Sequence, residues 1–300
     1  IEKAIDNSNL EKNDFLVLNN KTISIILKNT STILYIVSQE EKFNNLYLSE
    51  EIFDEELKDS NKILVRIPNL QKPISDVMVS FDGQNLFDKE TSQFGFYFNL
   101  ENLIKSFEEK QDKNILIIAI TSNEKRQTQY NPYPRGNSKV CFKHLKKIYS
   151  EFIPAVIENF NLNTTNAKRH VIGASMGGLM ALKFSIINPE FTNVICLSPA
   201  FWYGFPGILK DIPNIGENTF IHLYTGKKEG HIFGDKVRNI FPSEWKLDFS
   251  TNDNFYLSGV NAIELKLSEN NISHEYFVEE DGLHNEEYWR KNLITYFQNN

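Results

Sequence analysis

The sequence predicts an α/β fold with a mainly parallel central sheet, helices on both faces of that sheet and an antiparallel edge near the N-terminus. From residue 76 onward, short continuous apolar segments alternate with helix-like segments. That alternation is typical of parallel strands that helices bury on both faces. In the first sixty residues, β-like segments follow one another with no helix between them, which favours antiparallel pairing at one edge of the same sheet.

The N-terminal part contains four expected strands, at residues 15–18, 22–27, 32–37 and 63–67. Asn19 and Asn20 form a hairpin-like break between the first two strands, and Pro68 ends the fourth. The acidic stretch 49–59 is expected to be a solvated helix or loop.

Strands and helices alternate through the rest of the chain. Strands are expected at 76–81, 114–120, 169–172, 193–197, 219–224 and 274–278, and helices at 100–107, 142–160, from 178 onward, 259–269 and 286–298. No repeat, low-complexity tract or linker divides the sequence. We therefore expect one domain over 1–300, in which residues 1–60 form a β-rich extension of the sheet and 61–300 form the core.

Composition narrows the class of protein. Three hundred residues, 41% of them hydrophobic, suffice for a large core. The net charge of −7 and the scattered basic residues argue against a nucleic-acid-binding surface. No segment approaches the roughly 18 apolar residues of a membrane span. The chain begins at Ile1, so a leader that has been removed is one possibility. A cytoplasmic location is the expectation. The sequence predicts no oligomeric state.

The most informative motif is G-x-S-x-G, at residues 173–177. It joins an expected strand to an expected helix, and a serine on so sharp a turn presents its hydroxyl outside the sheet. The helix that follows directs its N-terminal amides toward negative charge formed beside that serine. Ser175 is therefore the candidate nucleophile. The alternative is an ordinary glycine-rich turn in which Ser175 caps the helix.

A nucleophilic serine needs a base to take its proton. In folds with this turn, the order along the chain is serine, acid, histidine, and four of the six histidines follow Ser175. His222 and His274 lie within expected strands. His284 lies in the polar loop between the last strand and the last helix, where such folds present the base. His284 is the predicted base, with an ordinary surface histidine as the alternative.

The acid is expected after the strand 219–224. Glu229 is the first choice because it follows the C-terminal end of that strand, the edge at which parallel sheets hold their sites. Asp235 is the second choice. Glu280 and Asp281 are near His284 in sequence but have less support. The alternative for Glu229 is a surface pair with one of the two lysines that precede it.

Two backbone amides are candidates for binding an oxyanion. One belongs to Met176, the residue after the nucleophile, and the other comes from a loop after an earlier strand. That loop begins with Asp82 and Gly83, where the glycine allows close approach and the amide of Gln84 can donate. A plain Asp-Gly turn is the alternative reading.

Five segments together resemble the putative-esterase branch of the α/β-hydrolases over roughly residues 60–300. They are D-G-Q-N-L-F (82–87), G-A-S-M-G-G (173–178), S-P-A-F-W (198–202), G-K-K-E (226–229) and H-N-E-E-Y-W-R (284–290). That branch includes siderophore trilactone, feruloyl and acetyl-xylan esterases, S-formylglutathione hydrolase and mycolyltransferases. The resemblance implies the α/β-hydrolase fold and the same five site residues.

The resemblance also implies an activity. It implies hydrolysis of a small-molecule ester or thioester through an acyl-enzyme on Ser175, without a metal or an organic cofactor. Arg126 and Tyr130 look like part of the family's arginine-containing loop. Phe201 and Trp202, with Tyr130, are candidates for the wall of an aromatic acyl pocket, such as that of a siderophore or feruloyl esterase, or they pack the loop. The alternatives are acyl transfer to an alcohol and a catalytically idle scaffold.

Overall fold

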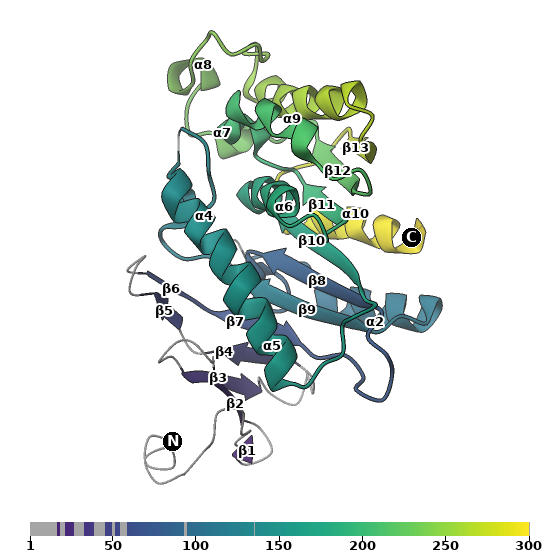
Figure 1. Cartoon of the computed structure of the whole chain (residues 1–300). Coiled ribbons are helices and arrows are strands. Elements are labelled where there is room, and N and C mark those ends of the chain that lie inside the picture. Colours follow the sequence, from purple (N-terminus) through teal and green to yellow (C-terminus); the bar gives the residue numbers. More distant parts are fainter. Residues whose placement is uncertain are drawn as a thin grey trace.

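The computed structural model describes residues 17–18, 22–26, 33–38, 46–49, 52–54, 59–92, 95–134 and 136–299. Its main feature is an 11-stranded sheet in the order β1-β2-β3-β4-β7-β9-β8-β10-β11-β12-β13 (Figure 1). These strands are Val17–Leu18, Thr22–Ile26, Ile33–Ser38, Leu46–Ser49, Ile63–Arg66, Ile115–Ile120, Asp76–Phe81, Lys168–Ala174, Asn193–Leu197, Phe220–Gly226 and Ser273–Glu279, in that order across the sheet.

The direction of pairing divides the sheet into two parts. From β9 through β8 to β13, every neighbouring pair is parallel. From β1 to β4, and onward through β7 to β9, every pair is antiparallel. This arrangement confirms the predicted α/β class and its antiparallel N-terminal edge. The division of the chain into a single domain stays a prediction.

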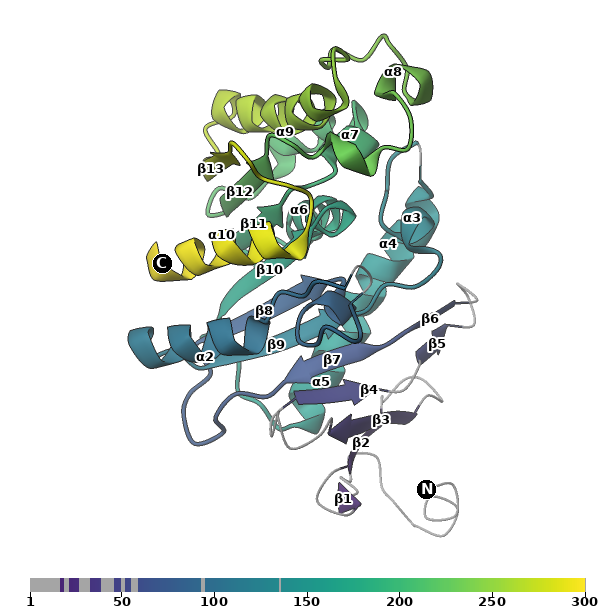
Figure 2. The same ribbon diagram turned by 180° about the vertical axis from the view of Figure 1, so that it is seen from behind.

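Helices cover both faces of the sheet (Figure 2). The longer ones are α2 (Leu100–Gln111), α4 (Ser138–Lys147), α5 (Ile153–Asn159), α6 (Met176–Ile187), α9 (Asn252–Glu269) and α10 (Glu286–Asn299). Residues of α4, α5, α6 and α9 share one buried apolar cluster, and residues of α2 and α10 share the other. The central strands are therefore buried on both sides, and all six residues of β9 are buried. Within the described residues, no helix combines the length and the apolar character needed to cross a bilayer.

Short helical segments complete the chain and lie mostly at the loops. They are α3 (Arg126–Gln129), α7 (Phe201–Gly204), α8 (Val237–Ile240), the 3-10 turns η1 (Gly83–Asn85), η3 (Gly207–Lys210), η4 (Ile212–Asn214) and η5 (Gly230–Ile232), and a π-helical turn, η2 (Ile148–Phe152). The helix expected at 142–160 is thus α4, η2 and α5 in succession.

The main differences from the sequence prediction lie in the N-terminal part and at α9. Strand β4 (Leu46–Ser49) lies where the sequence predicted no strand. The acidic stretch 49–59 contains β5 (Ile52–Asp54) and the first residue of β6 (Asp59–Asn61), and the two strands pair as a separate sheet. A helix or loop was therefore wrong for β5. Isoleucine and phenylalanine in β5 favour a strand. Helix α9 begins seven residues earlier than expected, because the Thr251 side chain accepts a hydrogen bond from the amide of Asn254 and caps it. Asn19, Asn20 and residues 55–58 lie outside the described part.

Asp76 anchors the start of β8, the strand that leads to the candidate oxyanion loop. Its carboxylate lies 2.7 Å from Nε2 of His170 and 3.4 Å from Nζ of Lys113. Burial opposes ionisation of Asp76, but hydrogen bonds with His170 and Ser75 and the charges of His170 and Lys113 outweigh it and lower the pKa from 3.8 to about 2. The ionised carboxylate therefore stabilises the folded state.

Asp76→Asn is expected to lower the free energy of unfolding by about 1–2 kcal/mol at pH 7. Because the folded pKa is the depressed one, the stabilisation is present above about pH 4 and is lost as the pH falls toward 2. Urea denaturation at pH 7 and pH 3 measures the difference, with Asp112→Asn, a change at an exposed carboxylate, as the control. An equal effect of Asp76→Asn at both pH values would contradict the assignment.

Candidate active site

Ser175 lies on a tight turn between β10 and α6. Its backbone has φ 56° and ψ −123°, a strained conformation for a residue other than glycine. The flanking glycines are required by contact: a Cβ at Gly173 would lie 2.1 Å from the carbonyl oxygen of Gly177, and one at Gly178 would lie 2.9 Å from Cβ of Pro199. The motif therefore has the geometry of a nucleophile elbow.

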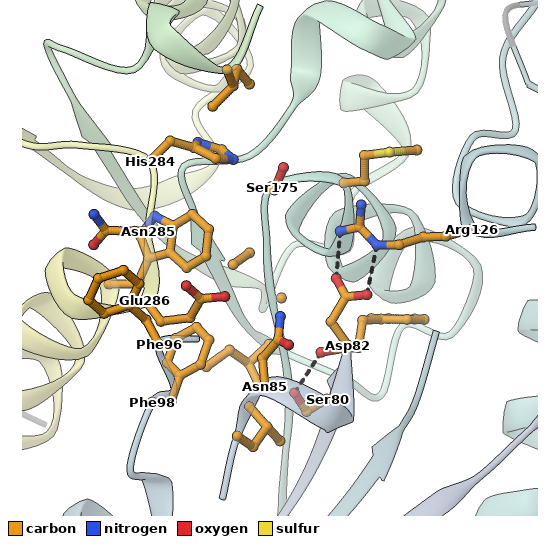
Figure 3. A pocket seen from close by; sticks show the side chains of 18 of the residues that line it. Ser80, Asp82, Asn85, Phe96, Phe98, Arg126, Ser175, His284, Asn285 and Glu286 are labelled. Carbon is orange, nitrogen blue, oxygen red and sulfur yellow. Dashed lines mark hydrogen bonds and ion pairs between the residues drawn. The ribbon is translucent and has the colours of Figure 1, made fainter. Parts of the chain in front are cut away.

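A cavity of about 630 Å³ opens beside Ser175. Charged and polar side chains reach it from several loops, among them Asp82, Arg126, His284 and Glu286. Figure 3 shows the imidazole of His284 directed toward Ser175 across the cavity. The aromatic side chains that line the cavity are Phe81, Phe96, Phe98, Trp202 and Trp289. The cavity thus combines an apolar wall with a few converging polar groups, as small-molecule sites do.

Glu229 holds His284 in a defined orientation. Its Oε2 lies 2.9 Å from Nδ1 of His284, and its side chain is fully buried. The other oxygen, Oε1, accepts hydrogen bonds of 2.5 Å from the hydroxyl of Ser198 and from the amide of Gly226. A carboxylate so placed keeps the proton of a neutral His284 on Nδ1, which leaves Nε2 as a proton acceptor.

The other carboxylates considered for this role lie elsewhere. Asp235 is exposed and accepts hydrogen bonds from the amide of Lys236 and the side chain of Asn239. Glu280 and Asp281 are exposed and form ion pairs of 2.5 Å with Lys227 and Lys228, respectively. Of these four carboxylates, Glu229 is the one that the structure brings to His284.

The two candidate oxyanion donors follow the ends of β8 and β10. Gln84 lies in η1, directly after β8, and Met176 is the first residue of α6. Neither amide donates to a carbonyl in the part of the chain that the structure describes. The Gln84 side chain and Ser122 exchange two hydrogen bonds, of 2.7 and 3.0 Å, which fix the loop. Met176 lines the cavity beside Ser175, whereas Gln84 does not, so the oxyanion role of the Gln84 amide stays a prediction.

Asp82 and Arg126 form an ion pair at the floor of the site. Nε and Nη2 of Arg126 donate to the two carboxylate oxygens of Asp82 at 2.8 and 2.7 Å (Figure 3). Burial lowers the pKa of Arg126, but the adjacent carboxylate outweighs that effect and raises it. The resemblance placed Arg126 in the family's arginine-containing loop, as a candidate substrate contact. Arg126 lines the cavity, but its charge is already paired with that of Asp82.

The predicted aromatic contacts divide into two groups. Trp202 lines the cavity, whereas Phe201 is fully buried and does not. Tyr130 is also fully buried, beneath Arg126, whose guanidinium carbon lies 5.2 Å from the centre of its ring. The wall of the cavity is formed instead by aromatic residues that the sequence did not single out, Phe98 and Trp289 among them.

Ser198 is a further residue that sequence reasoning missed. Besides donating to Glu229, its hydroxyl accepts a 2.7 Å hydrogen bond from the indole of Trp289, and its carbonyl accepts one of 2.5 Å from Tyr256. The rings of Trp289 and Tyr256 also contact that of His284, with centroids 4.9 and 5.2 Å away. One signal was available: Ser198 directly follows an apolar parallel strand, at the edge where such sheets hold their sites.

A family model described as "Putative esterase" matches residues 55–218, more than half of the chain. The chain belongs to the putative-esterase family. The match includes Asp82, Arg126 and Ser175 but ends before Glu229 and His284, so those two depend on the geometry alone.

Three further comparisons give more distant similarities. The uncharacterized protein YbbA of Bacillus subtilis (strain 168) is 25% identical over 159 residues, which are 50% of this chain and 60% of that protein. A solved ferulic acid esterase is 12% identical with a TM-score of 0.58, over 84% of this chain and 95% of that one. Siderophore hydrolase EstA from Aspergillus nidulans is 16% identical with a TM-score of 0.60, over 85% and 94%. At such identities the likeness shows the shared fold, which is the α/β-hydrolase fold that the sequence implied.

Proposed function

We propose that the protein is a serine hydrolase that cleaves carboxylic esters of small molecules through an acyl-enzyme on Ser175. The observation that carries the proposal is the 2.9 Å hydrogen bond between buried Glu229 and His284. It occurs beside a cavity that Ser175 and His284 both line. Membership of an esterase family supports the same reaction class.

The proposed reaction has two steps. Oγ of Ser175 attacks the acyl carbonyl carbon while Nε2 of His284 takes the hydroxyl proton, and Glu229 stabilises the imidazolium that forms. The amides of Gln84 and Met176 bind the oxyanion of the tetrahedral intermediate. His284 then returns the proton to the leaving alkoxide, and water attacks the acyl-enzyme by the same route.

The lining of the cavity supports an aromatic acyl group as substrate. The rings of Phe98 and Trp289 stack with centroids 5.9 Å apart, and both line the cavity with Trp202. The fold is shared with a ferulic acid esterase and with a siderophore hydrolase. We therefore propose feruloyl or catecholate siderophore esters as the first substrates to test, beside short acyl esters and S-formylglutathione.

A fluorophosphonate probe tests the nucleophile. One adduct is expected, on the peptide that contains Ser175, because only a serine activated by a base reacts readily with such probes. Mass spectrometry of the digested protein locates the adduct. Full labelling of Ser175→Ala would show that another residue is the nucleophile, and absence of labelling in the wild type would favour a scaffold role.

Ser198→Ala is expected to lower kcat for 4-nitrophenyl acetate by about tenfold, with a smaller change in KM. The variant removes one hydrogen bond to Glu229 and leaves the Trp289 indole without its acceptor, a loss of about 1–2 kcal/mol of positioning. Steady-state kinetics provide the measurement. Ser185→Ala is the control, since it also removes a buried hydroxyl, one bonded to the carbonyl of Phe191. Equal kcat values in the two variants would exclude a positioning role for Ser198.

A further inference from the structure

Glu286 is a buried carboxylate that the proposed reaction does not use. It is the first residue of α10, two positions after His284, and it is fully buried. Its side chain lines the cavity that Ser175 lines. Figure 3 shows its carboxylate directed into that cavity, on the side of Asn85.

Neither oxygen of Glu286 has a hydrogen-bond partner on any other described residue. The other carboxylates of the site are fully engaged. Asp82 has a bidentate bond from Arg126, and Glu229 accepts from His284, Ser198 and the amide of Gly226. Because a buried charge without a partner is costly, it is normally paired. Glu286 thus lacks the counter-ion that the site provides for its neighbours.

The surroundings of Glu286 make it responsive to such a partner. Burial raises the pKa of Glu286 most, and a hydrogen bond from its own backbone amide lowers it. The charge of Asp82 also raises this pKa, and that of Arg126 lowers it. The net result is a pKa that rises from 4.5 to about 7. In the described part of the chain, Arg126 is the one cation that contributes to this pKa, and its guanidinium already forms an ion pair with Asp82. A cationic group entering from the cavity would meet an unpaired carboxylate and, beside it, aromatic rings whose faces attract cations.

We propose that Glu286 is a specificity residue that binds a protonated amine on the substrate. This inference rests on the proposed esterase function. It changes the preferred substrates from aromatic esters in general to those that also carry an ammonium group. The ammonium has three N–H donors and the carboxylate has two unpaired acceptor oxygens, so the two match in charge and in hydrogen bonding. Without a ligand, Glu286 would be protonated in part of the molecules. A bound ammonium would keep its carboxylate ionised.

Two pairs of synthetic esters test the inference on either side of the scissile bond. On the acyl side, 4-nitrophenyl 4-(aminomethyl)benzoate is compared with 4-nitrophenyl 4-ethylbenzoate. On the alcohol side, 4-(aminomethyl)phenyl acetate is compared with 4-ethylphenyl acetate. In each pair, the first ester has an ammonium group where the second has a methyl group of similar size. The wild type is expected to prefer the amine in at least one pair by about tenfold in kcat/KM, the equivalent of one charge-assisted hydrogen bond.

Glu286→Gln is expected to reduce that preference to about one, because the neutral amide keeps the shape but not the charge. Glu287→Gln is the matched control, since it makes the same change on the next residue, which is exposed, and it should keep the preference. The preference should also rise between pH 6 and pH 8 in the wild type and not in Glu286→Gln. Asp82, Arg126, His231 and His284 face the same cavity, and a pH dependence that survives in Glu286→Gln would belong to one of them.

The possible failures are distinguishable. If the wild type hydrolyses all four esters without preferring either amine, or if Glu286→Gln keeps the preference, the inference about Glu286 is wrong and the esterase proposal stands. A preference for 4-(hydroxymethyl)benzoate equal to that for the aminomethyl ester would show that Glu286 binds neutral donors, which also overturns the ammonium assignment. If none of the esters is cleaved and no fluorophosphonate adduct forms, the esterase proposal itself fails.

Discussion

Ser175→Ala is expected to lower kcat/KM for 4-nitrophenyl acetate by about 10⁴ to 10⁶. Loss of the nucleophile in a serine–histidine–acid site removes the covalent route altogether, and only binding and oxyanion stabilisation are left. We expect the whole of this loss, because the strained turn presents the side chain of Ser175 outside the sheet and residues 173–177 contain no second serine. The measurement is initial-rate kinetics after removal of trace wild-type protein.

Two controls separate chemistry from folding in this experiment. Ser150→Ala removes an exposed hydroxyl on η2 that bonds to the carbonyl of Lys146, and its kcat/KM should stay within about twofold of wild type. The thermal midpoint of Ser175→Ala should stay close to that of the wild type, because the loss of one hydroxyl leaves the packing of β10 and α6 in place. A Ser175→Ala protein with more than a tenth of the wild-type rate would reject Ser175 as nucleophile.

The sequence predicted the scaffold well because its strands are unusual in composition. A strand buried on both faces is mostly apolar, and the runs 77–79, 115–120 and 194–197 contain only apolar residues. The bounds of β8 and β11 agree with the prediction to the residue. Strand bounds in the N-terminal part were harder to predict. Short polar strands such as β6 (Asp59–Asn61), which pairs with β5 outside the main sheet, have no such apolar pattern.

The candidate site divides in the same way. Ser175 and His284 could be predicted because a local turn motif and chain order constrain them. The sequence ranked Glu229 above Asp235 but could not exclude Asp235, since both follow the same strand and only the path of the loop decides which one faces His284. Likewise, the burial of Tyr130 and Phe201, and the contact of Ser198 with Trp289, depend on segments that are far apart in the chain.

Glu229→Gln is expected to lower kcat for the same ester by about 10⁴, the scale of the loss when the acid of such a triad is replaced by its amide. The reason lies in the hydrogen bonds of Oε1, which accepts from the hydroxyl of Ser198 and from the amide of Gly226. Because both partners are donors, the carbonyl oxygen of the glutamine must take this position. Its NH₂ group is then directed at His284.

An NH₂ group facing Nδ1 changes the tautomer of His284. Nδ1 must accept, so the proton of the neutral ring moves to Nε2, and Nε2 can no longer take the proton of Ser175. Asp235→Asn changes an exposed carboxylate that accepts hydrogen bonds from Lys236 and Asn239. It should change kcat by less than about twofold. If Asp235→Asn were the slower variant, the acid would be Asp235. If Glu229→Gln kept a tenth of the wild-type rate, His284 would act without an acid, as a serine–histidine pair. The glutamine variant therefore tests more than the identity of one residue: it tests whether the burial of Glu229 serves to fix the proton of His284.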